Sequence, residues 1–419
     1  MKNNHTYIGP IHEVLPMTGL PERGAVADSD LKRLTAQGIL MKNGKIERVD
    51  KHGTILPEAQ KLGAEIHILN GKYCALPGFL DSHTHICYAG SRAHDYAMRN
   101  AGKSYLEIAE AGGGIWDTVT HTRKATEDDL VSRIARRANL LLSRGITTIE
   151  VKSGYGLSPA EELKMLRAIR KAQKRTPATL IPTCLAAHTI PREYKGNAAG
   201  YIELLVEELL PQIREERLSA RVDAFIEKGS FTPENIRPYF KKAQELGFDI
   251  TVHADQFTTG GSRVAVDFGA VSADHLEAST AAQIKLLAQS NTVATALPGA
   301  TLGLGGSFAP ARKLLDQGAV LSIASDWNPG SAPMGDLLAQ AAIFGVFEKL
   351  SNAEILAGIT TRAAKALNLG HKVSLEKGNP ADLVLFRTDS YANILYHQGQ
   401  LKPDQVFKNG KQVFKTALS

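Results

Sequence analysis

The sequence predicts an α/β fold: a (β/α)8 TIM-type barrel with a small β-sandwich built from both ends of the chain. Short β-branched apolar runs alternate with longer segments of helical period, which is typical of parallel strands joined by helices. Eight such runs can be counted, and eight is the number that closes a barrel. The 419 residues exceed the roughly 250 of a bare barrel, which leaves room for a second unit.

The eight predicted barrel strands follow one another at helix-length intervals. They lie near Ala75–Leu80, Ile146–Val151, Thr179–Ala187, Val222–Glu227, Asp249–His253, Val271–His275, Thr292–Leu297 and Val320–Ser325.

Helix boundary signals lie between these runs. Ser158-Pro159-Ala160-Glu161 has the pattern of a capping box with proline at the first helical position, and Thr232-Pro233-Glu234 predicts the start of another helix. Gly145 and Gly247 stand where a left-handed residue is expected to end a helix.

The second unit is predicted from hairpin signals at both ends of the chain. Gly38–Val49 and Val406–Phe414 alternate like strands and are interrupted by Asn43-Gly44 and Asn409-Gly410, a pair typical of tight hairpins. A further strand is predicted over Ala381–Arg387, after a turn. We expect these segments to form one sandwich; the alternative is two unrelated hairpins. The predicted division is residues 1–75 and 376–419 for the sandwich and 76–375 for the barrel.

Composition narrows the class of protein. With 43% hydrophobic and 22% charged residues, the chain is typical of a globular protein. Its net charge of +6 is spread along the chain, which suits a small anionic substrate and gives no nucleic-acid-binding patch. Three scattered cysteines make neither a disulfide framework nor a thiolate zinc cluster and indicate a reducing compartment. We find no signal peptide or membrane span, so a cytoplasmic location is expected.

Polar residues that carry chemistry fall at the predicted carboxyl ends of the strands, where barrel enzymes place their active sites. Asp81-Ser82-His83-Thr84-His85 ends the first strand, and residues two apart on an extended chain point the same way. His188, His253, His275 and Asp326 end four others. A single histidine is more often structural, and we interpret the remaining eight in that way: His5, His12, His52, His67, His94, His121, His371 and His397.

The convergence of four residues at one rim predicts a metal site formed by His83, His85, His253 and Asp326. Three imidazoles and one carboxylate favour zinc, with iron or manganese as alternatives. Such an ion lowers the pKa of bound water towards ~7 and so supplies hydroxide at neutral pH. Asp326 is the candidate to pass the proton to the leaving nitrogen. His275 is expected to orient the water or stabilise the developing charge; its alternative role is that of a fourth histidine ligand.

Several motifs resemble those of the imidazolonepropionase family within the amidohydrolase superfamily. The resemblance runs from about Leu76 to Asp382. It is carried by Pro77–His85, Gly90-Ser91-Arg92, Ala111–Ile115, Glu150–Gly156, His253-Ala254-Asp255-Gln256 and Ser325–Ser331.

This resemblance implies a hydrolase that opens the ring of 4-imidazolone-5-propanoate to N-formimidoyl-L-glutamate in histidine degradation, by attack of hydroxide on one zinc or iron ion. It also assigns substrate binding to Arg92, Tyr155, His188, Gln256, Asn328, Gly330 and Ser331. Arg92 suits the propionate because a guanidinium grips a carboxylate with two parallel hydrogen bonds. Without the resemblance, Arg92 would be interpreted as a solvated surface charge.

One position departs from many superfamily members, which have glutamate where this chain has Gln256. Because an amide cannot act as a general base, the proton transfers would fall to Asp326 and His275. Two alternative functions stay open: a related deaminase of a nucleobase-like ring, and a non-catalytic barrel. A homodimer is also considered.

Overall fold

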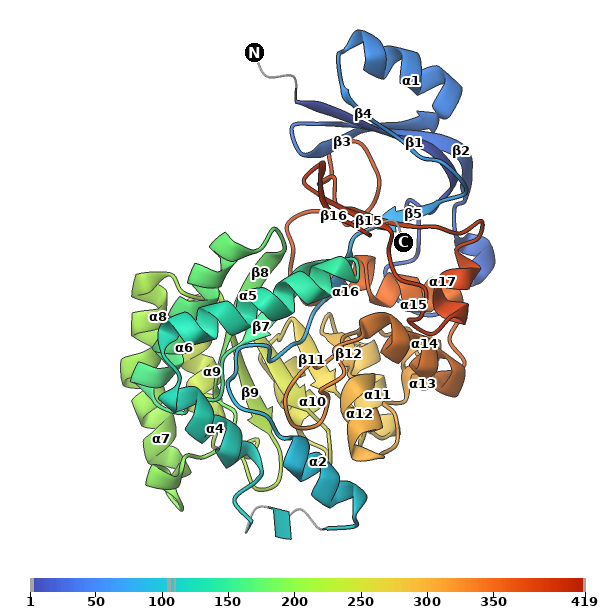
Figure 1. The fold of residues 1–419 in the computed structure, drawn as a ribbon. Coiled ribbons are helices and arrows are strands. Elements are labelled where there is room, and N and C mark those ends of the chain that lie inside the picture. Colours follow the sequence, from blue (N-terminus) through green and yellow to red (C-terminus); the bar gives the residue numbers. More distant parts are fainter. Residues whose placement is uncertain (1–3, 104–106, 109–110, 417–419) are drawn as a thin grey trace.

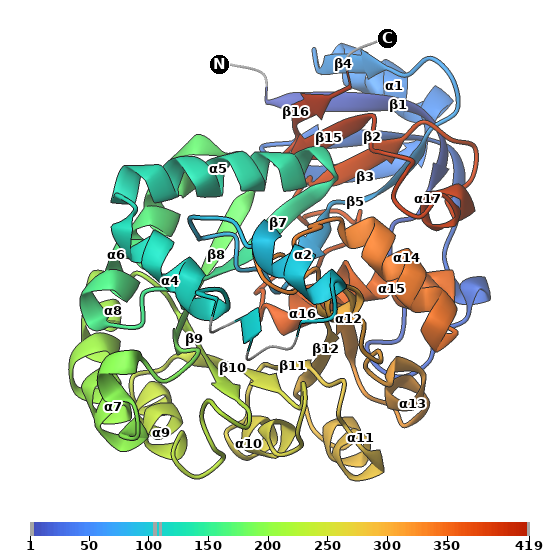
Figure 2. The same cartoon turned by 60° about the horizontal axis from the view of Figure 1, so that its bottom comes forward.

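The computed structural model describes residues 4–103, 107–108 and 111–416, and it contains two sheets, one forming a barrel (Figures 1 and 2). Neighbouring barrel strands are parallel and follow chain order. They are β6 (Phe79–Asp81), β7 (Ile146–Lys152), β8 (Thr179–Ala187), β9 (Arg221–Ile226), β10 (Asp249–Ala254), β11 (Ser272–His275), β12 (Val293–Ala296) and β13 (Leu321–Ile323). The predicted barrel is confirmed.

Backbone hydrogen bonds beyond the strand ends join the last strand to the first. Asp326 N donates to His83 O at 3.0 Å, and His85 N donates to Trp327 O at 2.9 Å. These bonds close the ring at the carboxyl ends of β6 and β13, and they join residues 243 and 242 positions apart in the sequence.

The first predicted strand is divided between the two sheets. The run near Ala75–Leu80 consists of β5 (Cys74–Pro77), which belongs to the small sheet, and β6, which belongs to the barrel. Gly78 separates them, and a β-carbon there would lie 2.4 Å from the Thr147 side chain on β7. The prediction merged the two strands because both are apolar and buried, so nothing in their hydrophobicity marks the change of sheet.

Helices surround the strands, as Figure 2 shows. After β6 come α2 (Ala93–Asn100), α4 (Ile115–Lys124) and α5 (Glu127–Ser143); after β7, α6 (Pro159–Ala172) and η2 (Gln173–Arg175); after β8, η3 (Arg192–Tyr194), α7 (Ala198–Leu204), η4 (Leu205–Leu209) and α8 (Leu210–Glu216); after β9, α9 (Arg237–Glu245); after β10, α10 (Gly261–Asp267); after β11, α11 (Ala281–Ala288); after β12, α12 (Pro298–Leu304) and α13 (Ala311–Asp316); and after β13, α14 (Leu337–Glu348), α15 (Asn352–Gly358) and α16 (Thr361–Ala366). Among the described residues, no helix has both the length and the apolar character that a membrane crossing needs.

The helix signals were only partly correct. Gly145 and Gly247 have φ of 88° and 73° just after α5 and α9, as predicted. Helix α6 begins at Pro159, but the side chain of Ser158 makes no capping bond. Helix α9 begins at Arg237, later than Thr232-Pro233-Glu234 predicted, because residues 233–236 form a separate turn.

Both ends of the chain enter one small sheet, in the order β16-β15-β14-β5-β1-β2-β3 with β4 beside β1 (Figure 1). Its remaining strands are β1 (His5–Val14), β2 (Leu34–Lys42), β3 (Lys45–Lys51), β4 (Glu65–Ile68), β14 (Leu383–Phe386), β15 (Gln405–Lys408) and β16 (Lys411–Lys415). Helix α1 (His52–Lys61) packs on them, while η1 (Asp28–Asp30) and α17 (Ala392–Tyr396) contact the barrel helices α15 and α14. Both Asn-Gly hairpins form, with positive φ at Asn43 and Asn409.

The small sheet folds back on itself around its own core. Ile46 N, in β3, donates to Asn379 O at 2.9 Å, just before β14. Ile8, Leu383 and Phe407 pack in the enclosed cluster, which is separate from the barrel core. The residue limits predicted for the sandwich and the barrel stay a prediction.

Candidate metal centre and substrate site

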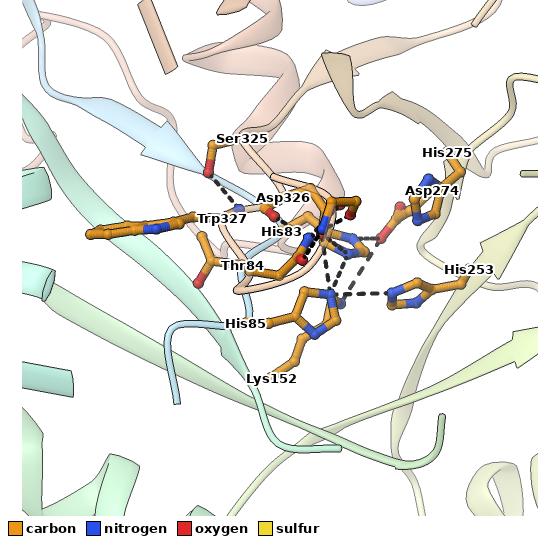
Figure 3. A network of polar contacts seen from close by, with 12 residues as sticks. His83, Thr84, His85, Lys152, His253, Asp274, His275, Ser325, Asp326 and Trp327 are labelled. Carbon is orange, nitrogen blue, oxygen red and sulfur yellow. Dashed lines mark hydrogen bonds and ion pairs between the residues drawn. The ribbon is translucent and has the colours of Figure 1, made fainter. Parts of the chain in front are cut away.

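Three histidines converge at the carboxyl end of the barrel (Figure 3). His83 and His85 follow β6, and His253 lies on β10. The Nε2 atom of His85 lies 3.2 Å from that of His83 and 3.4 Å from that of His253. All three side chains are buried, and their ligand atoms lie within 4.8 Å of one another. The structure therefore brings together three of the four predicted ligands in one group.

Asp326, which follows β13, lies against two histidines of this group. Its Oδ1 lies 3.2 Å from His85 Nε2 and 3.5 Å from His83 Nε2. The residue has a left-handed φ of 51°, and Asn328 Nδ2 donates to its Oδ2 at 3.0 Å. Burial raises the pKa of Asp326, while His275 and His253 lower it in part. This loop conformation turns the carboxylate towards the imidazoles.

Two further aspartates fix the orientation of the ligand rings. Asp274 Oδ2 lies 2.7 Å from His83 Nδ1, and Asp223 Oδ2 lies 2.9 Å from His253 Nδ1. Because a carboxylate accepts, His83 Nδ1 carries the proton and its Nε2 presents a lone pair to the centre. The 2.9 Å contact with Asp223 favours the same arrangement for His253. Burial lowers the pKa of His85 to about 3 and that of His253 to about 4, so both rings are neutral near pH 7.

These residues fit a divalent cation. Metal–nitrogen bonds of about 2.0–2.1 Å in a tetrahedral site place neighbouring ligand atoms roughly 3.3 Å apart, close to the observed separations of the three Nε2 atoms. Asp326 Oδ1 is buried and, among the described residues, accepts no hydrogen bond. A cation at this point would satisfy that oxygen and the three lone pairs together.

His275, at the end of β11, lies beside this group and outside it. Its ring centroid is 5.3 Å from that of His253, and its Nδ1 is 3.4 Å from Glu277 Oε1. Burial lowers the pKa of His275, but the carboxylates of Glu277, Asp326 and Asp274 together outweigh burial, so the net pKa is raised. The structure thus places His275 next to the three grouped histidines, and its predicted role beside a bound water stays a prediction.

The aromatic side of the site is formed by His188 and Tyr155. The His188 ring is stacked on His85, with centroids 5.4 Å apart and planes 20° apart, and its Nδ1 donates to Gly154 O. The Tyr155 ring lies 5.4 Å from His188 and 6.1 Å from His85. Both predicted residues therefore border the histidine group.

Arg92 and the loop after β13 form another part of the site. Arg92 Nε donates to Asp95 Oδ2 at 2.7 Å, while its two Nη groups have no hydrogen bond within the described part of the chain. They face Gly330, where a β-carbon would lie 2.2 Å from Nη1. The guanidinium is thus held by Asp95 through Nε, and its two Nη groups are available to bind another group.

Asn328 is engaged within its own loop. Its Oδ1 accepts from Gly330 N and Ser331 N, and its Nδ2 donates to Asp326 and to Ser331 Oγ. The amide therefore shapes the loop and orients Asp326. Its predicted contact with substrate stays a prediction, as does that of Ser331.

Gln256 is half-buried in the loop after β10, and no hydrogen bond of its side chain occurs in the described ranges. Glu227 holds this loop by accepting from Phe257 N and Thr258 N. The structure thus places the Gln256 amide near the rim of the barrel, with no hydrogen-bond partner among the described residues.

Sequence reasoning missed a set of buried charges beneath the histidines. They are Glu150 and Lys152 on β7, Asp223 on β9, Asp274 on β11 and Glu162 on α6, all almost completely buried. A signal existed for the first four: a charged residue within a buried parallel strand is unusual and points to a polar barrel interior.

Glu162 secures the loop that carries Tyr155. Its carboxylate accepts from the backbone N–H groups of Gly154, Gly156 and Leu157 at 2.7–2.9 Å. This bonding explains how the loop keeps its shape where the side chain of Ser158 makes no capping bond.

Comparison with known proteins agrees with this geometry. Residues 74–413 match the amidohydrolase family. The chain is 40% identical to the imidazolonepropionase of Bdellovibrio bacteriovorus over 93% of this chain and 92% of that protein, and 40% identical to that of Bacillus cereus over 94% and 92%. This chain belongs to the imidazolonepropionase family of amidohydrolases.

Solved structures of other amidohydrolases share the fold. An adenosine deaminase from Xanthomonas campestris with bound zinc superimposes with a TM-score of 0.67 at 17% identity, over 98% of this chain and 93% of that protein. Amidohydrolases use a metal ion. The grouped histidines of this chain are compatible with such an ion. Family membership makes the chain a metal-dependent hydrolase and argues against a non-catalytic barrel.

Proposed function

We propose that the chain hydrolyses 4-imidazolone-5-propanoate to N-formimidoyl-L-glutamate, the ring-opening step of histidine degradation. The observation that carries this proposal is the convergence of three histidines and Asp326, with Arg92 on the adjacent loop, in a chain 40% identical to imidazolonepropionases. Water adds across the cyclic amide: the carbonyl carbon gains the hydroxyl group, the C–N bond breaks, and the ring nitrogen gains a proton.

His83, His85, His253 and Asp326 would hold one zinc or iron ion, with zinc favoured by the ligand set. When bound, the ion lowers the pKa of water so that a nucleophile is present near neutrality. Asp326 takes the proton from water and delivers it to the leaving nitrogen. His275 orients the reacting groups.

The substrate is an anion, and Arg92 is the cation that binds its propionate. The free Nη edge of Arg92 supports this assignment because two parallel N–H groups match a carboxylate. Tyr155, His188 and Gln256 would contact the ring, and Asn328, Gly330 and Ser331 would form the floor of the propionate site.

The experiment is a turnover assay on the purified chain with measured metal content. We expect loss of the imidazolone absorbance with formation of formimidoylglutamate, at one metal ion per chain. Release of ammonia from a nucleobase with no turnover of the imidazolone would favour the deaminase alternative. Size-exclusion chromatography and fractionation of cells would check the predicted homodimer and the predicted cytoplasmic location.

A further inference from the structure

A single ammonium group lies among three carboxylates beneath the histidine group. Lys152 Nζ is 2.7 Å from Glu150 Oε1, 2.8 Å from Asp223 Oδ2 and 4.0 Å from Asp274 Oδ2. Lys152, Glu150 and Asp223 have no exposed side-chain surface, and that of Asp274 is 1% exposed. This cluster lies in the buried interior of the barrel, where Figure 3 shows Lys152 below His85.

Two of these carboxylates are the ones that orient ligand histidines. Asp274 Oδ2, which faces the ammonium, also lies 2.7 Å from His83 Nδ1. Asp223 Oδ2, the atom that contacts Lys152, also lies 2.9 Å from His253 Nδ1. One lysine on β7 thus connects the supports of two histidines that belong to strands on different sides of the barrel.

Within the described ranges, no other lysine or arginine pairs with these two aspartates. Apart from the histidines, Lys152 is the only positively charged group that pairs with Asp223 or Asp274 in the described residues. The other groups that bind Asp274 Oδ2 are neutral, such as the hydroxyl of Thr251. Removing one member of a buried ion cluster leaves uncompensated charges, which then move apart or draw in water.

We propose that Lys152 is a positioning residue: it holds the two aspartates that orient His83 and His253 and so determines how tightly the site binds a divalent cation. The proposal rests on the metal site of the proposed function. The ion pairs of Lys152 are with these carboxylates, and Lys152 is not among the proposed metal ligands or substrate-binding residues.

The test is the zinc affinity of the full chain, measured by competition with a chromophoric chelator. Loss of outer groups that orient metal ligands costs about 10–100-fold in affinity, and we expect a loss of this size for Lys152→Met. Lys164→Met is the matched control. Lys164 is half-buried and donates to Arg123 O and Ala125 O, away from the ligands, so zinc affinity should stay within about twofold of the wild type.

A purely structural role is separated by measuring thermal unfolding of the metal-free proteins. Both lysine variants are expected to lose stability, but only Lys152→Met should lose affinity. If Lys152→Met does not fold, Glu150→Gln/Lys152→Met, which removes one charge of each sign, takes its place with the same expected loss. Wild-type zinc affinity in a folded Lys152→Met, or in the double variant, would overturn the proposal.

The zinc measurement needs no substrate. A wild-type chain that fails to turn over the imidazolone would contradict the proposed function alone, whereas unchanged zinc affinity would contradict the role of Lys152 alone.

Discussion

Arg92 and Gly330 are packed so closely that a β-carbon at position 330 would lie 2.2 Å from Arg92 Nη1. Arg92 comes from the segment before α2 and Gly330 from the loop after β13, so the contact joins opposite ends of the barrel sequence. On its other edge, the guanidinium is bound by Asp95. The absence of a side chain at 330 therefore determines where the arginine lies.

Gly330→Ala should weaken substrate binding with little cost in stability. The clashing atom is the end of a flexible side chain, so Arg92 can move aside, but it then leaves the position suited to a carboxylate. We expect KM for the imidazolone to rise about tenfold, equivalent to about 1.4 kcal/mol, with a nearly unchanged melting temperature. Gly306→Ala is the control, since no atom lies within 4 Å of a β-carbon there. Equal KM values in both variants would contradict the assigned role of Arg92.

Arg92→Lys should raise KM more than it lowers kcat. Lysine keeps the charge but cannot offer two parallel N–H groups, and hydrogen bonds to charged groups contribute about 1.5–3 kcal/mol. Steady-state kinetics would therefore show a KM about 10–100-fold higher. A fall confined to kcat would mean that the arginine acts on the transition state.

Asp326→Asn should abolish most activity in a folded protein. Asparagine tolerates the left-handed φ of 51° and can still bond to Asn328, but it cannot accept the proton. We expect kcat/KM to fall about 10²–10⁴-fold, with an unchanged circular dichroism spectrum. His83→Ala should inactivate the enzyme as well, by loss of a ligand. Near-normal turnover in either variant would show that the site is elsewhere.

The metal-free protein should lose stability as the pH falls below 6.5. Burial lowers the pKa of His188 from 6.5 to about 3, so between these values the unfolded chain binds a proton that the folded chain does not. Within this window, each such histidine lowers the free energy of unfolding by about 1.4 kcal/mol per pH unit. Above pH 6.5 it has no such effect. Urea unfolding with a chelator present, at pH 6.5 and 5.5, would measure this. His188→Gln should show a shallower pH dependence, and an identical slope would contradict the assignment.

The strand pattern and the polar residues at the strand ends could be predicted because both depend on local sequence. Eight apolar runs gave the barrel, and His83, His85, His253 and Asp326 lay where parallel strands bring their carboxyl ends together. The division of the first run into β5 and β6 could not be predicted, since a change of sheet at Gly78 leaves the hydrophobic pattern unchanged.

The supporting charges were missed for a different reason. Lys152, Asp223 and Asp274 lie on three strands, and their pairing depends on which side chains point into the barrel at the same height. The alignment of neighbouring strands that sets these heights cannot be derived from a single sequence. Glu162 was missed because an acidic residue in the first turn of a helix is common without any contact to a neighbouring loop.

The small sheet can be completed only after the last residues of the chain have been synthesised. Leu383 pairs with Pro77, a partner made 306 positions earlier, and β15 and β16 are added outside β14. All eight strands of the barrel are synthesised before those three, so the catalytic rim can assemble while the edge of β5 still lacks its neighbour. Until β14 is made, that edge is open to pairing with another strand.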